Sequence, residues 1–244
     1  MNKYILESFI KKYYLSGVNE TVKFVVKNTR LTVSSLSDNK LLRTSVELKD
    51  FTELPDCEFG VSDTTKLLKM LPVLNEDISF SLQSTDDKVT SIIISDGESD
   101  LKYVTSDLQV IPKSGTMKQL PDFQVTILID KDFVTKYLSA TSALQDCPYA
   151  TFLPTKTDAP DVVIGHNMRG LNTTKVKIKP KVTTTSTMIS RPLNFNAAHI
   201  KEILYTNKKI DNATLSVTDL GLVCIETIDD NCTSTYCVVE IKGE

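Results

Sequence analysis

The residue types that most often perform catalysis are few in this sequence, and their spacing forms no catalytic set. There are two histidines: His166 stands in a predicted turn and His199 in a predicted helix. Catalysis needs acids, bases or nucleophiles that converge on one point, and these two positions do not supply them. Gly165 and Gly170 have the glycine spacing of a phosphate loop, but Leu171-Asn172 occupies the place of its Lys-Ser/Thr pair. The sequence therefore predicts a protein that is not an enzyme.

The metal-binding patterns are also incomplete. Cys224, Cys232 and Cys237 lack the paired spacing of a zinc site. The segment Asp96–Asp100 carries the carboxylates of a metal loop, but a hairpin turn of this composition needs no metal. The five cysteines show no framework spacing, which indicates reduced thiols in an intracellular protein. We therefore expect no metal site and no cofactor.

Length and charge limit the remaining classes of protein. The 244 residues are enough for about two domains, each with its own core. No apolar run is long enough to cross a bilayer. The chain has 28 basic and 31 acidic residues, and the net charge of −3 does not by itself indicate a nucleic-acid-binding protein. A local stripe of one sign can still act over a Debye length of roughly 10 Å.

The elements that must position any functional residue are clearest in the segment Cys57–Pro112. Ser62 stands where a helix N-cap is expected, and Asp63 adds negative charge in the first turn. The helix that follows has leucines on one face and lysines on the other, and Pro72 breaks its pattern. The segment thus predicts one strand, one helix and three strands, at 58–61, 64–71, 78–83, 89–95 and 101–108.

This unit recurs along the chain. Predicted helices begin near Tyr4, Thr64, Lys131 and Ala197, a recurrence of about 60–70 residues. The first unit departs from the pattern because no clear strand precedes its helix. The other expected helices are 4–15, 131–144 and 197–206, and the other expected strands are 21–27, 30–36, 41–48, 123–129, 149–154, 161–165, 174–181, 193–195, 213–218, 222–228 and 235–241.

Pairs of units are expected to form domains. One unit is too small to bury its own apolar face, whereas two units packed together place helices on one side of antiparallel sheets. The segment Val110–Pro121 contains two prolines, a glycine and no periodicity, which is typical of a linker. We predict an α+β chain with an N-terminal domain at 1–109, an interdomain connector at 110–121 and a C-terminal domain at 122–244.

Every predicted helix carries lysine on its outward face. A stripe of this kind would make sequence-independent contacts with phosphates. The alternative is a solvated surface, because lysine is common on the polar face of surface helices. The lysines concerned are Lys11, Lys12, Lys66, Lys69, Lys136 and Lys201.

Short strings within the repeat resemble the DNA sliding clamps of the two-domain kind, the proliferating-cell clamp and the phage polymerase accessory clamp. The resemblance covers nearly the whole chain, and it depends on the order and spacing of the strings. Chain length and the lack of a tail are more similar to a phage clamp. The strings are Thr65–Lys69, Asn75–Ile78, Val110–Pro112, Lys175–Ile178 and Ile200–Leu204.

The resemblance implies a DNA polymerase sliding clamp, or processivity factor. Three copies would form a homotrimeric ring around duplex DNA, with the helices on the inner face of the antiparallel sheets. The expected partners are duplex DNA, DNA polymerase and a clamp loader. The resemblance places seven residues in the DNA-binding pore: Lys11, Lys12, Lys66, Lys69, Lys136, His199 and Lys201.

The resemblance also implies a subunit interface between strand 101–108 of one subunit and strand 174–181 of the next. The first strand is flanked by acidic residues and the second carries alternating lysines, so opposite charges would favour the correct partner. An alternative role for edge lysines is to block aggregation. The interface residues are expected to be Leu101, Tyr103, Thr105, Lys175, Lys177 and Lys179.

A partner-peptide pocket beside the connector is a further implication of the resemblance. The matching positions are Leu36, Leu41, Ile111, Pro112 and Val238. Leucines that flank a turn are more often core residues, which is the alternative for Leu36 and Leu41.

Two other functions stay open at this point. One is a clamp-fold regulatory or transcription factor that acts mainly through protein partners, and the other is a non-enzymatic β-rich virion protein. We expect an intracellular location, in the host cytoplasm for a phage-encoded clamp or in the nucleus for a eukaryotic-type one.

Overall fold

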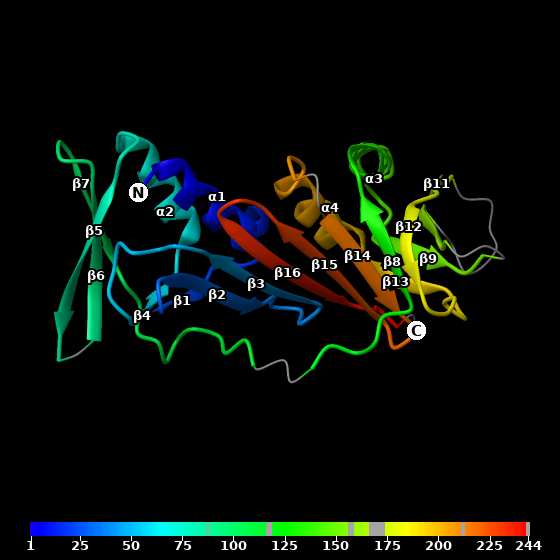
Figure 1. Ribbon diagram of the computed structural model, residues 1–244, viewed down its shortest axis with the longest axis horizontal. Coiled ribbons are helices and arrows are strands. Elements are labelled where there is room, and N and C mark those ends of the chain that lie inside the picture. The colour runs from blue at the N-terminus through cyan, green and yellow to red at the C-terminus, as the bar shows by residue number, and fades with distance from the viewer. Residues whose placement is uncertain (87, 116–118, 156–158, 166–173, 211–212, 243–244) are drawn as a thin grey trace. The chain divides into compact units, whose positions relative to one another are not determined.

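A computed structural model describes residues 1–242 except 87, 116–118, 156–158, 166–173 and 211–212 (Figure 1). The chain forms two compact units, which are described separately below. Unit 1 comprises Met1–Asp38, Arg43–Gly115 and Asp230–Ser234, and unit 2 comprises Asn39–Leu42, Thr116–Asp229 and Thr235–Glu244. Each unit therefore takes a short segment from the other half of the sequence, which the contiguous predicted domains do not include.

The described part of unit 1 contains two α-helices, two short 3-10 helices and two antiparallel sheets. One sheet has the strand order β3-β2-β1-β4 and the other has the order β5-β6-β7. Burial alternates strictly along β1, because one face of its sheet packs on the core. The elements are α1 (Lys3–Tyr14), η1 (Leu15–Gly17), β1 (Val22–Lys27), β2 (Arg30–Leu36), β3 (Leu42–Leu48), β4 (Cys57–Val61), α2 (Thr64–Met70), η2 (Leu71–Val73), β5 (Ser79–Thr85), β6 (Lys88–Ser95) and β7 (Asp100–Val104).

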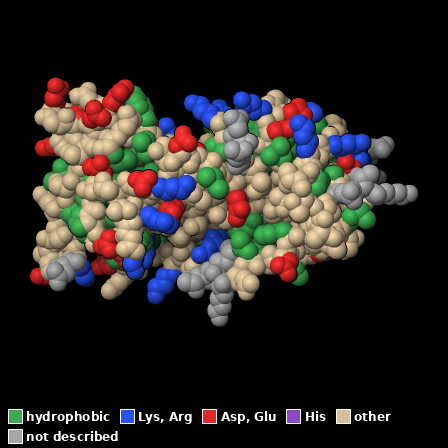
Figure 2. All heavy atoms as spheres, viewed as in Figure 1, with side chains coloured by type: hydrophobic (Ala, Val, Ile, Leu, Met, Phe, Trp, Pro, Cys, Tyr) green, Lys and Arg blue, Asp and Glu red, His purple; other side chains and the backbone are tan. Residues whose placement is uncertain are grey.

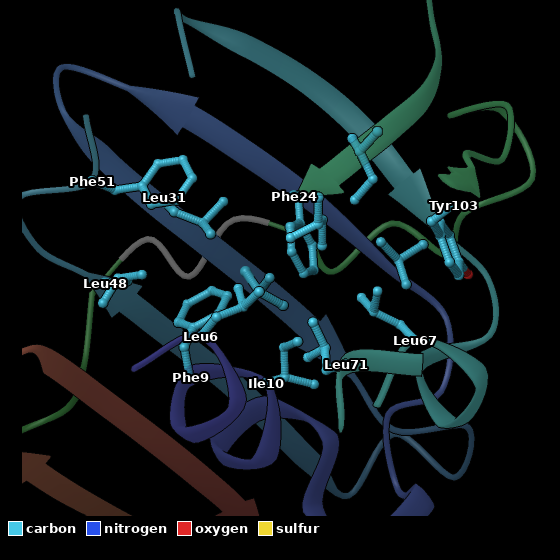
Figure 3. Packing of buried hydrophobic residues seen from close by; sticks show 14 of the residues in the cluster. Leu6, Phe9, Ile10, Phe24, Leu31, Leu48, Phe51, Leu67, Leu71 and Tyr103 are labelled. Atoms are coloured by element: carbon cyan, nitrogen blue, oxygen red, sulfur yellow. The ribbon is translucent and has the colours of Figure 1, made fainter. Parts of the chain in front are cut away.

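Aromatic rings form the centre of the unit 1 core, between helix α1 and the sheet (Figure 3). Phe9 and Tyr13 of α1 each meet Phe24 of β1 edge to face, with ring centroids 5.8 and 5.6 Å apart. Phe24 also lies 5.1 Å from Phe59 of β4. Complete burial raises the pKa of the Tyr13 hydroxyl. Both helices therefore cover one face of the sheet and leave their opposite sides outward.

Unit 2 has the same kind of construction. Its helices α3 and α4 pack together and cover β8, β14 and β15 (Figure 1). Its sheets have the strand orders β12-β8-β14-β15-β16 and β11-β10-β9-β13. The elements are β8 (Val125–Ile129), α3 (Lys131–Ala143), β9 (Tyr149–Leu153), β10 (Asp161–Ile164), β11 (Val176–Ile178), β12 (Lys181–Thr185), β13 (Leu193–Asn196), α4 (Ala197–Thr206), β14 (Ala213–Thr218), β15 (Leu222–Ile228) and β16 (Cys232–Val239). The predicted α+β class with antiparallel sheets is confirmed.

The four α-helices among the described residues begin with the same cap chemistry. A side-chain oxygen of Asn2, Asp63, Asp130 or Asn196 accepts a hydrogen bond from a backbone N–H of the first turn, at 2.6–3.0 Å. Asp130 and Asn196 immediately precede the predicted helices 131–144 and 197–206, and the sequence also favours these two residues as caps because Asp and Asn are common N-cap residues; both are confirmed. The predicted cap Ser62 is wrong, because Asp63 is the residue that immediately precedes the helix and its side chain accepts the hydrogen bond from Lys66 N. The recurrence of one cap type supports an internal duplication.

The predicted strand 174–181 is wrong, since two separate strands occupy its place. Pro180 has no backbone N–H to continue the ladder, and β11 ends at Ile178. The next strand, β12, pairs with β8 of the other sheet. Lys181 anchors β12 because its Nζ lies 2.6 Å from the Asp130 carboxylate, and this contact lowers the pKa of Asp130.

Two cysteines also differ from the prediction. Cys224 of β15 and Cys237 of β16 are both buried and form a disulfide in unit 2, so the expectation that every thiol is reduced is wrong for this pair. Antiparallel pairing places them directly opposite each other, which sequence spacing alone does not reveal.

The first of the four sequence repeats, which begins with helix α1, has no strand before its helix. Asn2 forms a single bridge with Asp77, and Lys3 N donates to Glu76 O at 2.7 Å. A short backbone contact thus takes the place of the strand that precedes the other helices.

Candidate nucleic-acid interface

The outward side of unit 1 carries three exposed lysines. Lys11 of α1 is 3.2 Å from Glu7, one turn earlier in the same helix. Lys66 and Lys69 of α2 are exposed, and neither forms an ion pair with any residue that the structure describes. These two ammonium groups are therefore available to an anionic ligand without first breaking a protein ion pair.

Lys12 does not share this position. Its exposure is 3%, and it precedes the buried Tyr13 at the border of the buried stripe of α1. The expectation that Lys12 faces outward is therefore wrong. Its long apolar stem allows a lysine to be covered in this way, which the helical pattern alone did not indicate.

Unit 2 contributes Lys136 and Lys201. Lys136 of α3 is exposed and lies 2.7 Å from Asp132, and Lys201 of α4 is partly exposed. His199 was expected beside them, but it is only 7% exposed and lies on the buried side of α4. Burial lowers the pKa of His199, and its Nδ1 has no hydrogen-bond partner among the described residues. His199 is therefore neutral at pH 7, and the outward orientation predicted for it is wrong.

Sequence reasoning missed an exposed aromatic residue with two lysines at the end of α4. Tyr205 is 52% exposed, and Lys208 Nζ lies 4.2 Å from the centre of its ring. Lys209 is also exposed. The available signal was the helical spacing, since Tyr205 follows Lys201 by four residues and so shares its face. In Figure 2, Lys and Arg side chains gather along the helix-bearing margin of unit 2.

The predicted interface residues of β7 do not point outward. Leu101 and Tyr103 are buried in the core of unit 1, and Thr105 Oγ1 donates to Val89 O at 2.6 Å. Thr105 N donates to Thr90 O of β6. Because backbone hydrogen-bonding groups alternate between the two edges of a strand, the N–H and C=O groups of Tyr103 point toward β6 as well. The alternate residues Lys102 and Val104 face the outer edge instead, and Val104 is 69% exposed.

The lysines of the other predicted edge are exposed. Lys175, Lys177 and Lys179 alternate along and beside β11, which is the terminal strand of its sheet. Lys177 lies 2.6 Å from Asp161 of the neighbouring strand β10. Their place in a subunit interface stays a prediction.

The predicted partner-pocket residues have different environments. In unit 1, Leu36 is half-buried, Pro112 is exposed, and Ile111 is buried against Gly60 of β4. In unit 2, Leu41 is half-buried and its carbonyl accepts a hydrogen bond from Val239 N at 2.8 Å, while Val238 is fully buried. Val238 is therefore a core residue, and a role of these five positions in a partner pocket stays a prediction.

An apolar cavity of about 490 Å³ lies elsewhere in unit 1, between β4 and residues 104–108. Phe59, Val89, Val104 and Leu108 are among its lining residues. Thr90 and Thr105 also line it, but their hydroxyls donate to backbone carbonyls of unit 1. The cavity adjoins the outer edge of β7.

Among the described residues, no group of three or more His, Cys, Asp or Glu side chains is placed to hold a metal ion. None of the described helices is long and apolar enough to span a membrane. His166 and the segment Gly170–Asn172 lie outside the described residues.

Comparison with known proteins gives a structural match without a sequence match. No protein-family model matches the chain, and no curated protein matches it either. Among solved structures, the proliferating cellular nuclear antigen of Entamoeba histolytica matches over 97% of this chain and 96% of its own, with a TM-score of 0.71. This chain has the DNA clamp fold. The sequence identity is 16%, so the likeness shows the fold alone. The resemblance to sliding clamps that the sequence strings indicated is confirmed for the fold.

Proposed function

We propose that this clamp-fold chain is a DNA polymerase processivity factor, a homotrimeric ring that encircles duplex DNA. The observation that carries the proposal is the full-length match to the clamp fold together with four equivalently capped helices. Each helix presents at least one exposed or partly exposed lysine away from the core: Lys11, Lys66, Lys69, Lys136 and Lys201.

These lysines suit a ring that must slide. Contacts between ammonium groups and phosphates are independent of sequence and weaken with salt, so the ring can exchange one phosphate for the next. Base-specific contacts would stop the movement. In this proposal Lys66 and Lys69 are the strongest contributors, because no described carboxylate competes for them.

The ring would close through the outer edges of β7 and β11. The outward backbone of Lys102 and Val104 offers hydrogen-bonding groups to a strand from the next subunit. Asp100 and Asp107 flank the first edge, and the exposed lysines beside β11 carry the opposite charge. A head-to-tail contact of this type closes into a ring when its rotation is one third of a turn.

The remaining parts of the proposal follow from this role. A processivity clamp performs no chemistry of its own, so the protein is not an enzyme and needs no cofactor. Its partners would be a DNA polymerase and a clamp loader. Its location would be intracellular, in the cytoplasm of the host for a phage clamp or in the nucleus for a eukaryotic-type one.

The test is the mass in solution combined with primer extension. Multi-angle light scattering should give three times the 27.2 kDa of one chain. In the presence of polymerase and loader, the protein should lengthen the products made on a long primed template. A trimer that leaves product length unchanged would contradict the polymerase role.

A clamp-fold regulatory factor that acts mainly through protein partners is the second candidate. The net charge of −3 and the burial of Lys12 and His199 favour it over a strongly DNA-binding surface. A folded monomer with no effect on extension would support this candidate. A virion role, the third alternative, would require the protein to be found in purified particles.

A further inference from the structure

The end of helix α4 and the turn after it carry a basic and aromatic patch, of which the proposed ring uses only Lys201. It consists of Lys201, Tyr205, Lys208 and Lys209, hereafter the Tyr205 patch. Lys201 and Tyr205 are four residues apart and lie on the side of α4 opposite to the buried Ile200, Ile203 and Leu204. Lys208 and Lys209 stand in the turn that follows the last helical residue, Thr206.

The geometry of the patch leaves an aromatic face exposed. Lys208 Nζ sits 4.2 Å from the centre of the Tyr205 ring, within the range of a cation–π contact. One ammonium group covers only one face of a ring, and Tyr205 remains 52% exposed. The contact therefore leaves about half of the Tyr205 residue accessible to solvent.

The local charge is positive although the whole chain is negative. Lys208 lies against the Tyr205 ring, Lys201 is one helical turn before Tyr205, and Lys209 is the residue after Lys208, while Glu202 is the acidic residue next to Lys201 on α4. The patch thus carries a net charge of about +2 within one Debye length, in a chain with a net charge of −3. An anionic ligand that also carries an aromatic group could contact the lysines with its charge and the Tyr205 ring with its aromatic group.

We propose that the Tyr205 patch binds single-stranded DNA, with one base stacked on Tyr205 and the neighbouring phosphates on the lysines. Proteins that hold single strands combine basic side chains with aromatic platforms, because an unpaired base exposes its flat face. In duplex DNA the faces are covered by the adjacent base pairs, so the ring could not be used in this way. The inference rests on the proposed function only in taking DNA as the ligand.

Helix α1 offers a matched comparison within the same chain. Tyr4 is 54% exposed, almost the same as Tyr205. Lys3 Nζ is 5.5 Å from its ring, but Lys3 is buried and donates to Leu74 O. The next residues on the outward side are Glu7 and Ser8, so Tyr4 provides a ring without the cluster of lysines.

The absence of tryptophan from the sequence permits a direct test. Tyr205→Trp and Tyr4→Trp each create a protein with one tryptophan, whose fluorescence is quenched when a base stacks on it. Titration with a 12-residue oligothymidylate at low salt should at least halve the emission of the position 205 variant and leave the position 4 variant nearly unchanged. Equal quenching at both positions, or none at position 205, would overturn the proposal.

A second measurement separates stacking from contact with the hydroxyl. Tyr205→Ala should weaken binding of the labelled oligothymidylate by roughly 5-fold or more, whereas Tyr205→Phe should keep the wild-type affinity. Lys208→Gln should reduce the salt slope by about 0.7. If Tyr205→Phe loses as much affinity as Tyr205→Ala, the hydroxyl makes the contact and the stacking proposal fails.

The same proteins distinguish this inference from the proposed function. Tyr205→Ala should leave the mass in solution and the circular dichroism spectrum unchanged, because the side chain is exposed. A monomeric wild type that still shows quenching at position 205 would contradict the ring and leave the single-strand site standing. A trimer that supports normal primer extension but shows no quenching at position 205 would support the ring and contradict the single-strand site.

Discussion

Charge reversal at Lys66 and Lys69 tests the proposed pore most sharply. Both residues lie on the outward side of α2 and form no ion pair with a described residue, so the substitutions Lys66→Glu and Lys69→Glu break no ion pair between described residues. Lys27→Glu is the matched control. Lys27 is also exposed, but it lies on β1 and alternates with the core-facing Val26, which places it on the sheet face away from the helices.

The expected loss can be worked from the charges. A lysine about 4 Å from a phosphate gains roughly 1 kcal/mol in water, and reversing its sign turns that attraction into a similar repulsion. Two reversals therefore cost roughly 2–4 kcal/mol in each subunit, once partial screening at physiological salt is included. A loss of 2 kcal/mol already corresponds to roughly a 30-fold weaker hold on DNA.

The assay is primer extension on a long singly primed circle with polymerase and loader, at 150 mM salt. The double variant should shorten products at least severalfold, and lowering the salt should restore part of the length because the contacts are electrostatic. Light scattering must show that the ring is intact in the variant. Extension that is unchanged in the double variant, or reduced equally by Lys27→Glu, would refute the assignment of α2 to the pore.

Three further outcomes follow from the structure. Val104→Glu should dissociate the ring to the 27.2 kDa chain, because the residue lies on the outer edge of β7. The control Val73→Glu changes a residue of similar exposure, 73%, and should leave the mass unchanged. The same mass for both variants would contradict the assignment of this edge to the subunit interface. Replacing Cys224 and Cys237 by alanine should lower the free energy of unfolding by about 3 kcal/mol, as expected for a loop of this length, and finding five titratable thiols in the unreduced protein would contradict the cross-link. Burial lowers the pKa of His199 in the folded protein, so folding stability should fall as pH drops below about 6.5; His199→Gln should flatten the pH dependence of the melting temperature between pH 7 and 5, and an unchanged profile would contradict the burial.

The repeat and its helices could be predicted because local chemistry determines them. Apolar residues at helical spacing and an Asx cap appear together at Asp130 and Asn196, and both helices begin there in the structure. Strand alternation likewise located β1 and β2 to within one residue. These signals are contained within a few neighbouring residues.

The site residues were harder to predict, because they depend on the packing of whole elements. Lys12 and His199 each occupy the border of a helical stripe, where a small rotation of the helix decides between solvent and core. The register of the hydrogen bonds between β7 and β6 determines which residues of β7 face outward. A shift of that register by one residue would turn Tyr103 outward in place of Val104. The Cys224–Cys237 disulfide depends on hairpin register in the same way.

The mass of the protein in solution tests the central proposal most directly. Light scattering of the wild-type chain at micromolar concentration should give a single species of three times 27.2 kDa, and Val104→Glu should convert it to one chain. A wild-type protein that is folded and remains at 27.2 kDa across that concentration range would contradict the ring, and with it the role of the lysine-bearing helices as a pore around DNA.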